Sequence, residues 1–188
     1  SMYRAAWRCA GKPLAQCLGD KLHSWGTNGL ASLIPNGLAQ GLLGYGFSCS
    51  QAIGGADLQE LPQEKIDQEL MVRYAQCAAL FPIMQFSKAP WSILDDEHLA
   101  YCREAALLHQ KLGEEILELA KDVAETGEPI IRHMVYSYPD GGYEEVHDQF
   151  MLGDDILVAP VVKKGAVSRT IHFPEGTWVG DDESVVEG

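Results

Sequence analysis

Apolar and polar residues alternate in blocks along most of the chain. Short apolar runs bounded by turn residues predict buried β-strands, and apolar positions that recur every three or four residues predict helices between them. The expected strands cover residues 3–11, 44–50, 83–87 and 130–139. The expected helices cover residues 30–43, 63–81 and 97–125. Residues 11–29 are interpreted as a polar loop. Alternating strands and helices predict a parallel sheet, open or closed.

The third helix has the clearest terminal signals. Asp95 or Asp96 can cap its first turn, because a carboxylate accepts from the unpaired amides there. Gly127, followed by Pro129, is typical of a helix end. Gly113 lies inside the helix, and we expect it to bend or divide the helix there.

The pattern of apolar and polar residues changes after residue 150. Short apolar runs follow one another, separated by Gly and Pro and without intervening helices, which predicts antiparallel β-structure. The expected strands lie in DQFMLG, DDILVAPVVK, SRTIHFP and GTWVG. We therefore predict an α/β fold class, with an α/β domain over residues 1–150 and an all-β domain that begins at residues 151–188.

Composition narrows the class of partner. Apolar residues make up 46% of the chain, and the net charge is −13. An acidic surface repels phosphate backbones and anionic lipids, so we expect neither nucleic acid nor a membrane as a partner. The five cysteines are odd in number and lack close CxxC spacing, which favours reduced, structural thiols and a cytoplasmic location. The histidines show no metal-binding spacing, so no metal and no cofactor are expected.

Polar residues stand near aromatic ones in the loops that follow several predicted strands. Carboxylates, amides and arginines bind sugar hydroxyls, and aromatic rings cover the apolar face of a sugar. The pairs are Arg4 with Trp7, Asp20 with Trp25, Gln51 with Phe47, and Gln85 with Trp91. The alternative is that the polar groups are merely solvated, that Asp20 caps a turn, that Arg4 forms a structural salt bridge, and that Trp7 and Trp91 are packing residues.

Several segments, in order, resemble glycoside hydrolase family 31, the family of retaining α-glucosidases, α-xylosidases, α-galactosidases and sulfoquinovosidases. Arg4 stands where the family has an arginine sixteen residues before its acid/base aspartate. The other matching segments are GDKLHSW, QAIGG, ELMVRYAQCAALFPIMQFSKAPW, GEPIIRHMVYSYP and DQFMLGDDILVAPVVKKGAVSRTIHFPEGTW. The resemblance covers almost the whole chain, and six matches in family order are unexpected by chance.

The resemblance implies the C-terminal part of a (β/α)8 barrel, followed by the start of an antiparallel β-sandwich. It also implies a retaining exo-α-glycosidase with Asp20 as general acid/base, since this chemistry needs one carboxylate as acid/base and one as nucleophile. The sugar-binding residues it implies are Arg4, Trp25, Gln51, Gln85 and Trp91. The family's nucleophile motif, W-x-D-x-x-E, does not occur in these 188 residues. We therefore expect it upstream, and we expect this chain alone to be inactive, with the preceding part of the barrel or a second copy as its partner.

Two positions depart from the family pattern. Gln51 stands where most members have a sugar-binding aspartate, and Gln85-Phe86-Ser87 stands where many have Arg-x-His. The second departure agrees with a branch associated with α-galactosidase activity, so an α-galactoside becomes the leading substrate. The first departure and the absent nucleophile favour an alternative: a non-catalytic carbohydrate-binding or scaffold segment. A complete small enzyme of another kind lacks support, because no nucleophile elbow or nucleotide-binding loop occurs.

Overall fold

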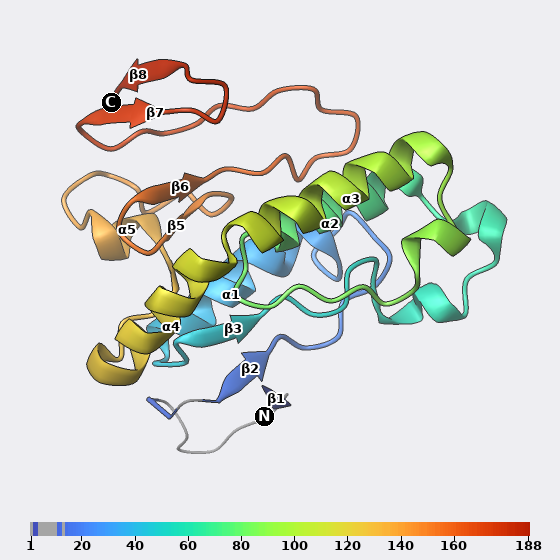
Figure 1. Cartoon of the computed structure of the whole chain (residues 1–188), viewed down its shortest axis with the longest axis horizontal. Helices are drawn as coiled ribbons and strands as arrows, with labels where there is room; N and C mark the ends of the chain where they lie inside the picture. The colour runs from blue at the N-terminus through green and yellow to red at the C-terminus, as the bar shows by residue number, and fades with distance from the viewer. Residues whose placement is uncertain (1, 4–10, 13) are drawn as a thin grey trace.

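The computed structural model describes residues 2–3, 11–12 and 14–188. Strands β1 (Met2–Tyr3), β2 (Ala15–Cys17) and β3 (Phe47–Cys49) form a parallel sheet in that order, as Figure 1 shows. An isolated parallel bridge between Ile53 and Phe86 lies beyond β3 in the chain. The parallel pairing expected from strand–helix alternation is therefore confirmed for these strands.

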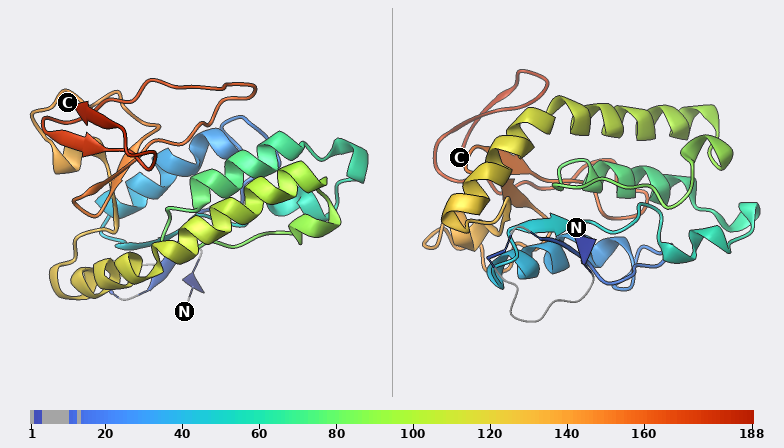
Figure 2. Two further views of the ribbon diagram at one scale, coloured as in Figure 1. Left: turned by 45° about the horizontal axis from the view of Figure 1, so that its top comes forward. Right: turned by 60° about the horizontal axis from the view of Figure 1, so that its bottom comes forward.

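Helices connect and cover these strands. The α-helices are α1 (Leu33–Leu42), α2 (Gln68–Ala78), α3 (Asp96–Lys111), α4 (Gly113–Thr126) and α5 (Met134–Ser137). Four 3₁₀ turns accompany them, at Leu30–Ser32, Ala56–Gln59, Gln63–Lys65 and Pro90–Ser92. Helix α1 packs against β3 and β4, and α2 packs against α3. In the right-hand view of Figure 2 the parallel sheet lies between α1 and the α3–α4 pair.

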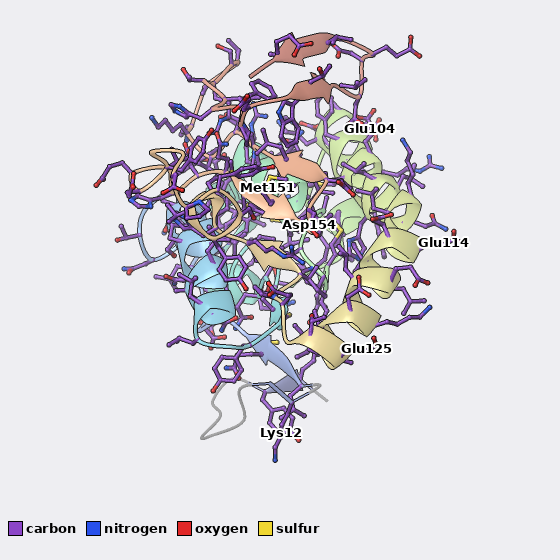
Figure 3. The ribbon with its side chains drawn as sticks, turned by 90° about the vertical axis from the view of Figure 1, so that its left-hand side faces the viewer. Lys12, Glu104, Glu114, Glu125, Met151 and Asp154 are labelled. Carbon is purple, nitrogen blue, oxygen red and sulfur yellow. The ribbon has the colours of Figure 1, made fainter. Side chains whose placement is uncertain are left out.

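The end signals predicted for the third helix, residues 97–125, are confirmed. Asp95 Oδ1 accepts from the His98 amide at 2.9 Å and so caps α3. Gly113 is the first residue of α4, so the predicted long helix is divided there. Gly127 ends α4 in the left-handed conformation, with φ of 81°. Figure 3 shows Glu104, Glu114 and Glu125 directed away from the body of the molecule along α3 and α4.

The C-terminal strands pair in antiparallel fashion. Strands β4 (Ile131–Arg132), β5 (Phe150–Leu152) and β6 (Ile156–Val158) form one sheet, and β7 (Thr177–Val179) and β8 (Val185–Glu187) form a hairpin. Figure 1 places this hairpin and β1 on opposite sides of the molecule. The predicted domain boundary lies between residues 150 and 151. Ile131 and Arg132 of β4 pair with Leu152 and Met151 of β5, so the sheet crosses this boundary. The division into two domains stays a prediction.

For two segments the sequence predicts the wrong kind of secondary structure. Residues 11–29 were expected to be a loop, yet they contain β2, whose hydrogen-bonding partners are the distant strands β1 and β3. Residues 130–139 were expected to be one strand, yet only Ile131–Arg132 is extended. His133 Nδ1 then accepts from the Val135 amide at 3.1 Å and begins α5. An apolar run without strict alternation does not distinguish these outcomes.

Other assignments are wrong in extent. Helix α2 begins at Gln68 rather than residue 63, because Asp67 accepts from the Leu70 amide and caps it there. The strand expected at residues 83–87 is reduced to the bridge at Phe86. Residues 168–174, SRTIHFP, form no strand. Of the strand predicted over residues 3–11, Tyr3 lies in β1 and Gly11 lies in a turn, and residues 4–10 lie outside the described part of the chain.

One apolar core joins the early and late parts of the chain. Tyr74 and Phe81, at and beyond α2, are 1% and 0% exposed, and Phe150 of β5 is equally buried. The Phe81 and Phe150 rings meet edge to face with centroids 5.7 Å apart. Among the described residues, no helix combines the length and the apolar character needed to cross a membrane. The core therefore holds the parallel sheet, α1–α4 and the antiparallel sheet together, which is the platform for the site.

Candidate functional site

Three adjacent chain segments end side by side on the parallel sheet. The Leu18 amide, just after β2, donates to Cys49 O of β3 at 3.2 Å. The Ile53 amide, just after β3, donates to Gln85 O at 2.7 Å. Asp20, Gln51 and Gln85 therefore lie at neighbouring carboxyl ends of parallel segments. Loops at that end of a parallel sheet are where ligands bind in β/α folds.

Gln51 connects two of these ends directly. Its Nε2 donates to Leu18 O at 2.7 Å and to Asp20 Oδ1 at 2.9 Å. Its Oε1 accepts from the Ala52 amide at 3.1 Å. The side chain is buried, and its backbone is in the left-handed region, with φ of 66°. The structure thus brings Asp20 and Gln51, two residues selected from sequence, into contact.

Asp20 is exposed on this face, although its proposed role would place it in a closed site. The described elements support it from the Gln51 side, and Leu18, two residues earlier, is buried. Arg4, the other charged residue selected from sequence, lies outside the described residues, as does Trp7. The contact of Asp20 with Gln51 is therefore established, whereas a contact of Asp20 with Arg4 stays a prediction.

The Gly54–Gly55 turn holds the loop that follows Asp20. Both glycines have φ of 94°. A Cβ at Gly55 would collide with the backbone of Leu22 and His23, and one at Gly54 would collide with Met71. The turn permits the Ala56 amide to donate to Lys21 O at 2.8 Å. Glycine is thus required here for a close approach between two backbones.

Trp25 lies beside the start of α2. Its indole Nε1 donates to Asp67 Oδ2 at 3.0 Å, and its ring packs partly against the core. The same carboxylate accepts from Lys164 Nζ at 2.7 Å. Burial alone would raise the pKa of Asp67, but the hydrogen bonds from Lys164, Trp25 and the Leu70 amide outweigh burial and hold this pKa below its usual value. The indole N–H of Trp25 is therefore occupied within the protein, and contact of the ring with sugar stays a prediction.

Gln85 and Trp91 both face solvent. The Trp91 side chain, in the turn Pro90–Ser92, is 75% exposed. Trp91 therefore does not pack into the core of the described residues, and its place in the sugar subsite stays a prediction. An exposed indole is the kind of surface on which the apolar face of a sugar stacks.

Sequence reasoning missed three residues that build this region. They are Asp57, which accepts from the His23 amide at 2.7 Å, Asp67, and Tyr74, whose hydroxyl donates to Leu22 O at 3.1 Å. Only Asp67 carries a local signal, as a carboxylate before an apolar helix. The partners of the other two lie 34 and 52 positions away in the sequence.

No group of three or more His, Cys, Asp or Glu side chains that could hold a metal ion occurs among the described residues. Cys17, Cys49, Cys77 and Cys102 are buried. Burial raises the pKa of the Cys77 thiol to about 12 and that of Cys102 to about 11, which disfavours the reactive thiolate.

The fold and the site define an α/β chain whose parallel segments end in carboxylate and amide side chains. Residues 127–187 match the family model described as the glycosyl hydrolase family 31 C-terminal domain. The mouse "Myogenesis-regulating glycosidase" is 38% identical over 85% of this chain and 23% of its own length. The "SITS-binding protein" of Tetronarce californica is 31% identical over 97% of this chain and 26% of its own length. The chain belongs to glycoside hydrolase family 31.

A solved structure agrees with this assignment. The cycloalternan-forming enzyme from Listeria monocytogenes, in complex with a pentasaccharide substrate, superposes with a TM-score of 0.82 at 26% identity. The match covers 93% of this chain and 17% of that chain. The chain spans about a quarter of the length of the two curated relatives above.

Proposed function

We propose that the protein to which this chain belongs is a retaining exo-α-glycosidase. This chain supplies the last strands of its (β/α)8 barrel and the beginning of a β-sandwich domain. The parallel order β1-β2-β3, followed by the antiparallel sheet, supports this arrangement. Among the described residues β1 pairs only with β2, and Met2 and Tyr3 are exposed. An exposed sheet edge is suited to pairing with another strand, here one from the preceding part of the barrel.

Asp20 acts as the general acid/base. It protonates the departing glycosidic oxygen and then deprotonates the water that releases the sugar. The observation that carries this role is the contact between Asp20 and Gln51 at the carboxyl ends of β2 and β3. The nucleophilic carboxylate comes from outside these residues, about 5–5.5 Å from Asp20 as retention requires. This chain alone is inactive.

The substrate is a small α-linked glycoside, with an α-galactoside as the leading class. Gln85 supplies amide hydrogen bonds at the sheet edge, and Trp91 supplies an apolar platform. Arg4 and Trp25 complete the sugar subsite. Ser87 does not replace a cationic contact, since its Oγ donates to Ile53 O at 2.6 Å. Neutral groups thus occupy the place where many family members have Arg-x-His.

The alternative is a non-catalytic carbohydrate-binding or scaffold protein. Gln51 favours it, because both ends of its side-chain amide are engaged by Leu18, Asp20 and Ala52 within the protein. Little of that amide remains for sugar hydroxyls. A third arrangement, association of two copies of the chain, would cover the same exposed edge of β1.

The natural full-length protein should be assayed on nitrophenyl α-galactoside, α-glucoside and α-xyloside. We expect turnover of the α-galactoside and a loss of about 10²–10⁴-fold in kcat for Asp20→Asn, since a general acid contributes about that much. The control is Asp140→Asn, which changes an exposed aspartate in a distant turn.

Equal kcat for wild type and Asp20→Asn would remove Asp20 from its role. Turnover of another α-glycoside in place of the galactoside would correct the substrate class and leave the mechanism standing. Sugar binding by calorimetry without turnover of any glycoside would establish the non-catalytic alternative.

A further inference from the structure

The segment that carries Asp20 is held by hydrogen bonds both before and after this residue. Upstream, the Leu18 amide donates to Cys49 O, and Leu18 O accepts from Gln51 Nε2. Downstream, Lys21 O accepts from the Ala56 amide at 2.8 Å. Leu22 O accepts from the hydroxyl of Tyr74 on α2. The position of Asp20 therefore depends on how firmly residues 21–24 are held.

His23 makes three further contacts of this segment, two of them through its ring. Its backbone amide donates to Asp57 Oδ1 at 2.7 Å. Its ring Nδ1 lies 2.8 Å from Gly54 O, and its ring Nε2 lies 2.9 Å from the amide nitrogen of Asp67. One imidazole thus spans the space between the Gly54–Gly55 turn and the first turn of α2.

These partners determine where the ring carries its proton. The Asp67 amide can only donate, so Nε2 must present its lone pair to it. Gly54 O can only accept, so Nδ1 must carry the hydrogen. Both contacts are satisfied together only by the neutral Nδ1–H tautomer. An imidazolium would direct an N–H from Nε2 at the N–H of Asp67.

We infer that His23, as this neutral Nδ1–H tautomer, is the positioning residue that fixes residues 21–24 and so aims the Asp20 carboxylate. The inference deepens the proposed function and rests on it for the role of Asp20. His23 touches no reacting atom in this mechanism. It acts through the backbone, by tying the Asp20 loop to the Gly54–Gly55 turn and to the N-terminus of α2.

The first experiment measures kcat and KM of the full-length protein for His23→Ala, His23→Asn and His23→Gln. His23→Ala should lower kcat by about 100-fold, the cost of a displacement of about 1 Å in a catalytic group, with KM little changed. Asn can restore the donor to Gly54 O, and Gln can restore the acceptor for the Asp67 amide. Each should therefore recover part of the lost kcat.

His109→Ala is the matched control. His109 Nδ1 lies 2.8 Å from Ala79 O and ties α3 to the end of α2, away from the Asp20 loop. It should lower the Tm while kcat of the folded protein is retained. A kcat for His23→Ala equal to that of His109→Ala, or a loss confined to KM, would overturn the inference.

The second experiment does not depend on turnover. Nitrogen-15 NMR of histidine-labelled full-length protein at pH 7.5 should show His23 as the Nδ1–H tautomer. Hydrogen exchange of the Ala56 amide, which holds Lys21 O, should speed up in His23→Ala and remain slow in His109→Ala. An Nε2–H tautomer, or unchanged exchange at Ala56, would overturn the inference. If the wild-type protein shows the Nδ1–H tautomer of His23 and slow exchange at Ala56 but no turnover, the proposed function is rejected. The conclusion that His23 holds residues 21–24 in place then still stands.

Discussion

The side-chain amide of Gln51 donates to Oδ1 of Asp20 at 2.9 Å, across 31 positions of the sequence. Gln51, with its left-handed backbone, lies two residues after the end of β3, and its side chain reaches the end of β2. The family resemblance selected these two residues for separate roles. Because they are hydrogen-bonded to each other, a substitution at either residue should also affect the other.

Gln51→Glu should destabilise the protein by about 1–3 kcal/mol, the usual cost of an unsatisfied buried polar group. The new carboxylate would face Leu18 O and the Asp20 carboxylate without a donor between them. Gln51→Met removes the same hydrogen bonds without adding a charge, so its loss should be smaller. Urea unfolding at pH 7 measures the difference. Equal stability for Gln51→Glu and wild type would contradict this contact.

Gly55→Ala should cost about 1–3 kcal/mol, because φ of 94° is strained for any residue with a Cβ and because the new methyl group meets the backbone of Leu22 and His23. Gly113→Ala is the control. A Cβ at Gly113 meets no heavy atom within 4 Å, and Gly113 begins a helix, so this change should stabilise by about 0.4–1 kcal/mol. Thermal unfolding that ranks the two variants in the opposite order would refute this account of the turn.

Asp67→Asn should lower stability near neutral pH. The folded state holds the pKa of Asp67 below its usual value, so the ionised carboxylate contributes stability above its unfolded pKa of about 3.9. That contribution is lost as the pH falls through the folded pKa. Asn retains helix-capping ability but not the charge that pairs with Lys164. Urea midpoints at pH 7, 5 and 3 should show a gap between wild type and variant that is largest at pH 7 and closes in acid. A gap that does not depend on pH would assign the effect to shape rather than charge.

Trp91→Ala should leave stability within about 0.5 kcal/mol of wild type, as is usual for an exposed side chain. KM for the glycoside should rise, because the apolar platform is lost. Leu43→Ala, which changes another exposed apolar side chain, should alter neither property. An unchanged KM for Trp91→Ala would leave the exposed indole without a role in sugar binding.

Local chemistry in the sequence was enough to predict the longer helices, α1 to α4, but not α5. The apolar spacing of residues 30–43 and 97–125, the cap at Asp95 and the left-handed Gly127 all act within one or two turns of the chain. Neighbouring residues decide such features, so they can be predicted without knowledge of the rest of the fold. The family motifs likewise selected Asp20 and Gln51 from the printed residues alone.

Short strands and the site network depended on tertiary structure. β2 has three residues and acquires its conformation from β1 and β3, so its own sequence could not distinguish it from a loop. The hydrogen bond from Trp25 to Asp67 and that from the Asp67 amide to His23 join residues more than 40 positions apart. Their energies exist only after the chain has brought the partners together. The sequence by itself therefore determined the longer helices and the family, whereas only the packed fold determined the short elements and which polar groups meet.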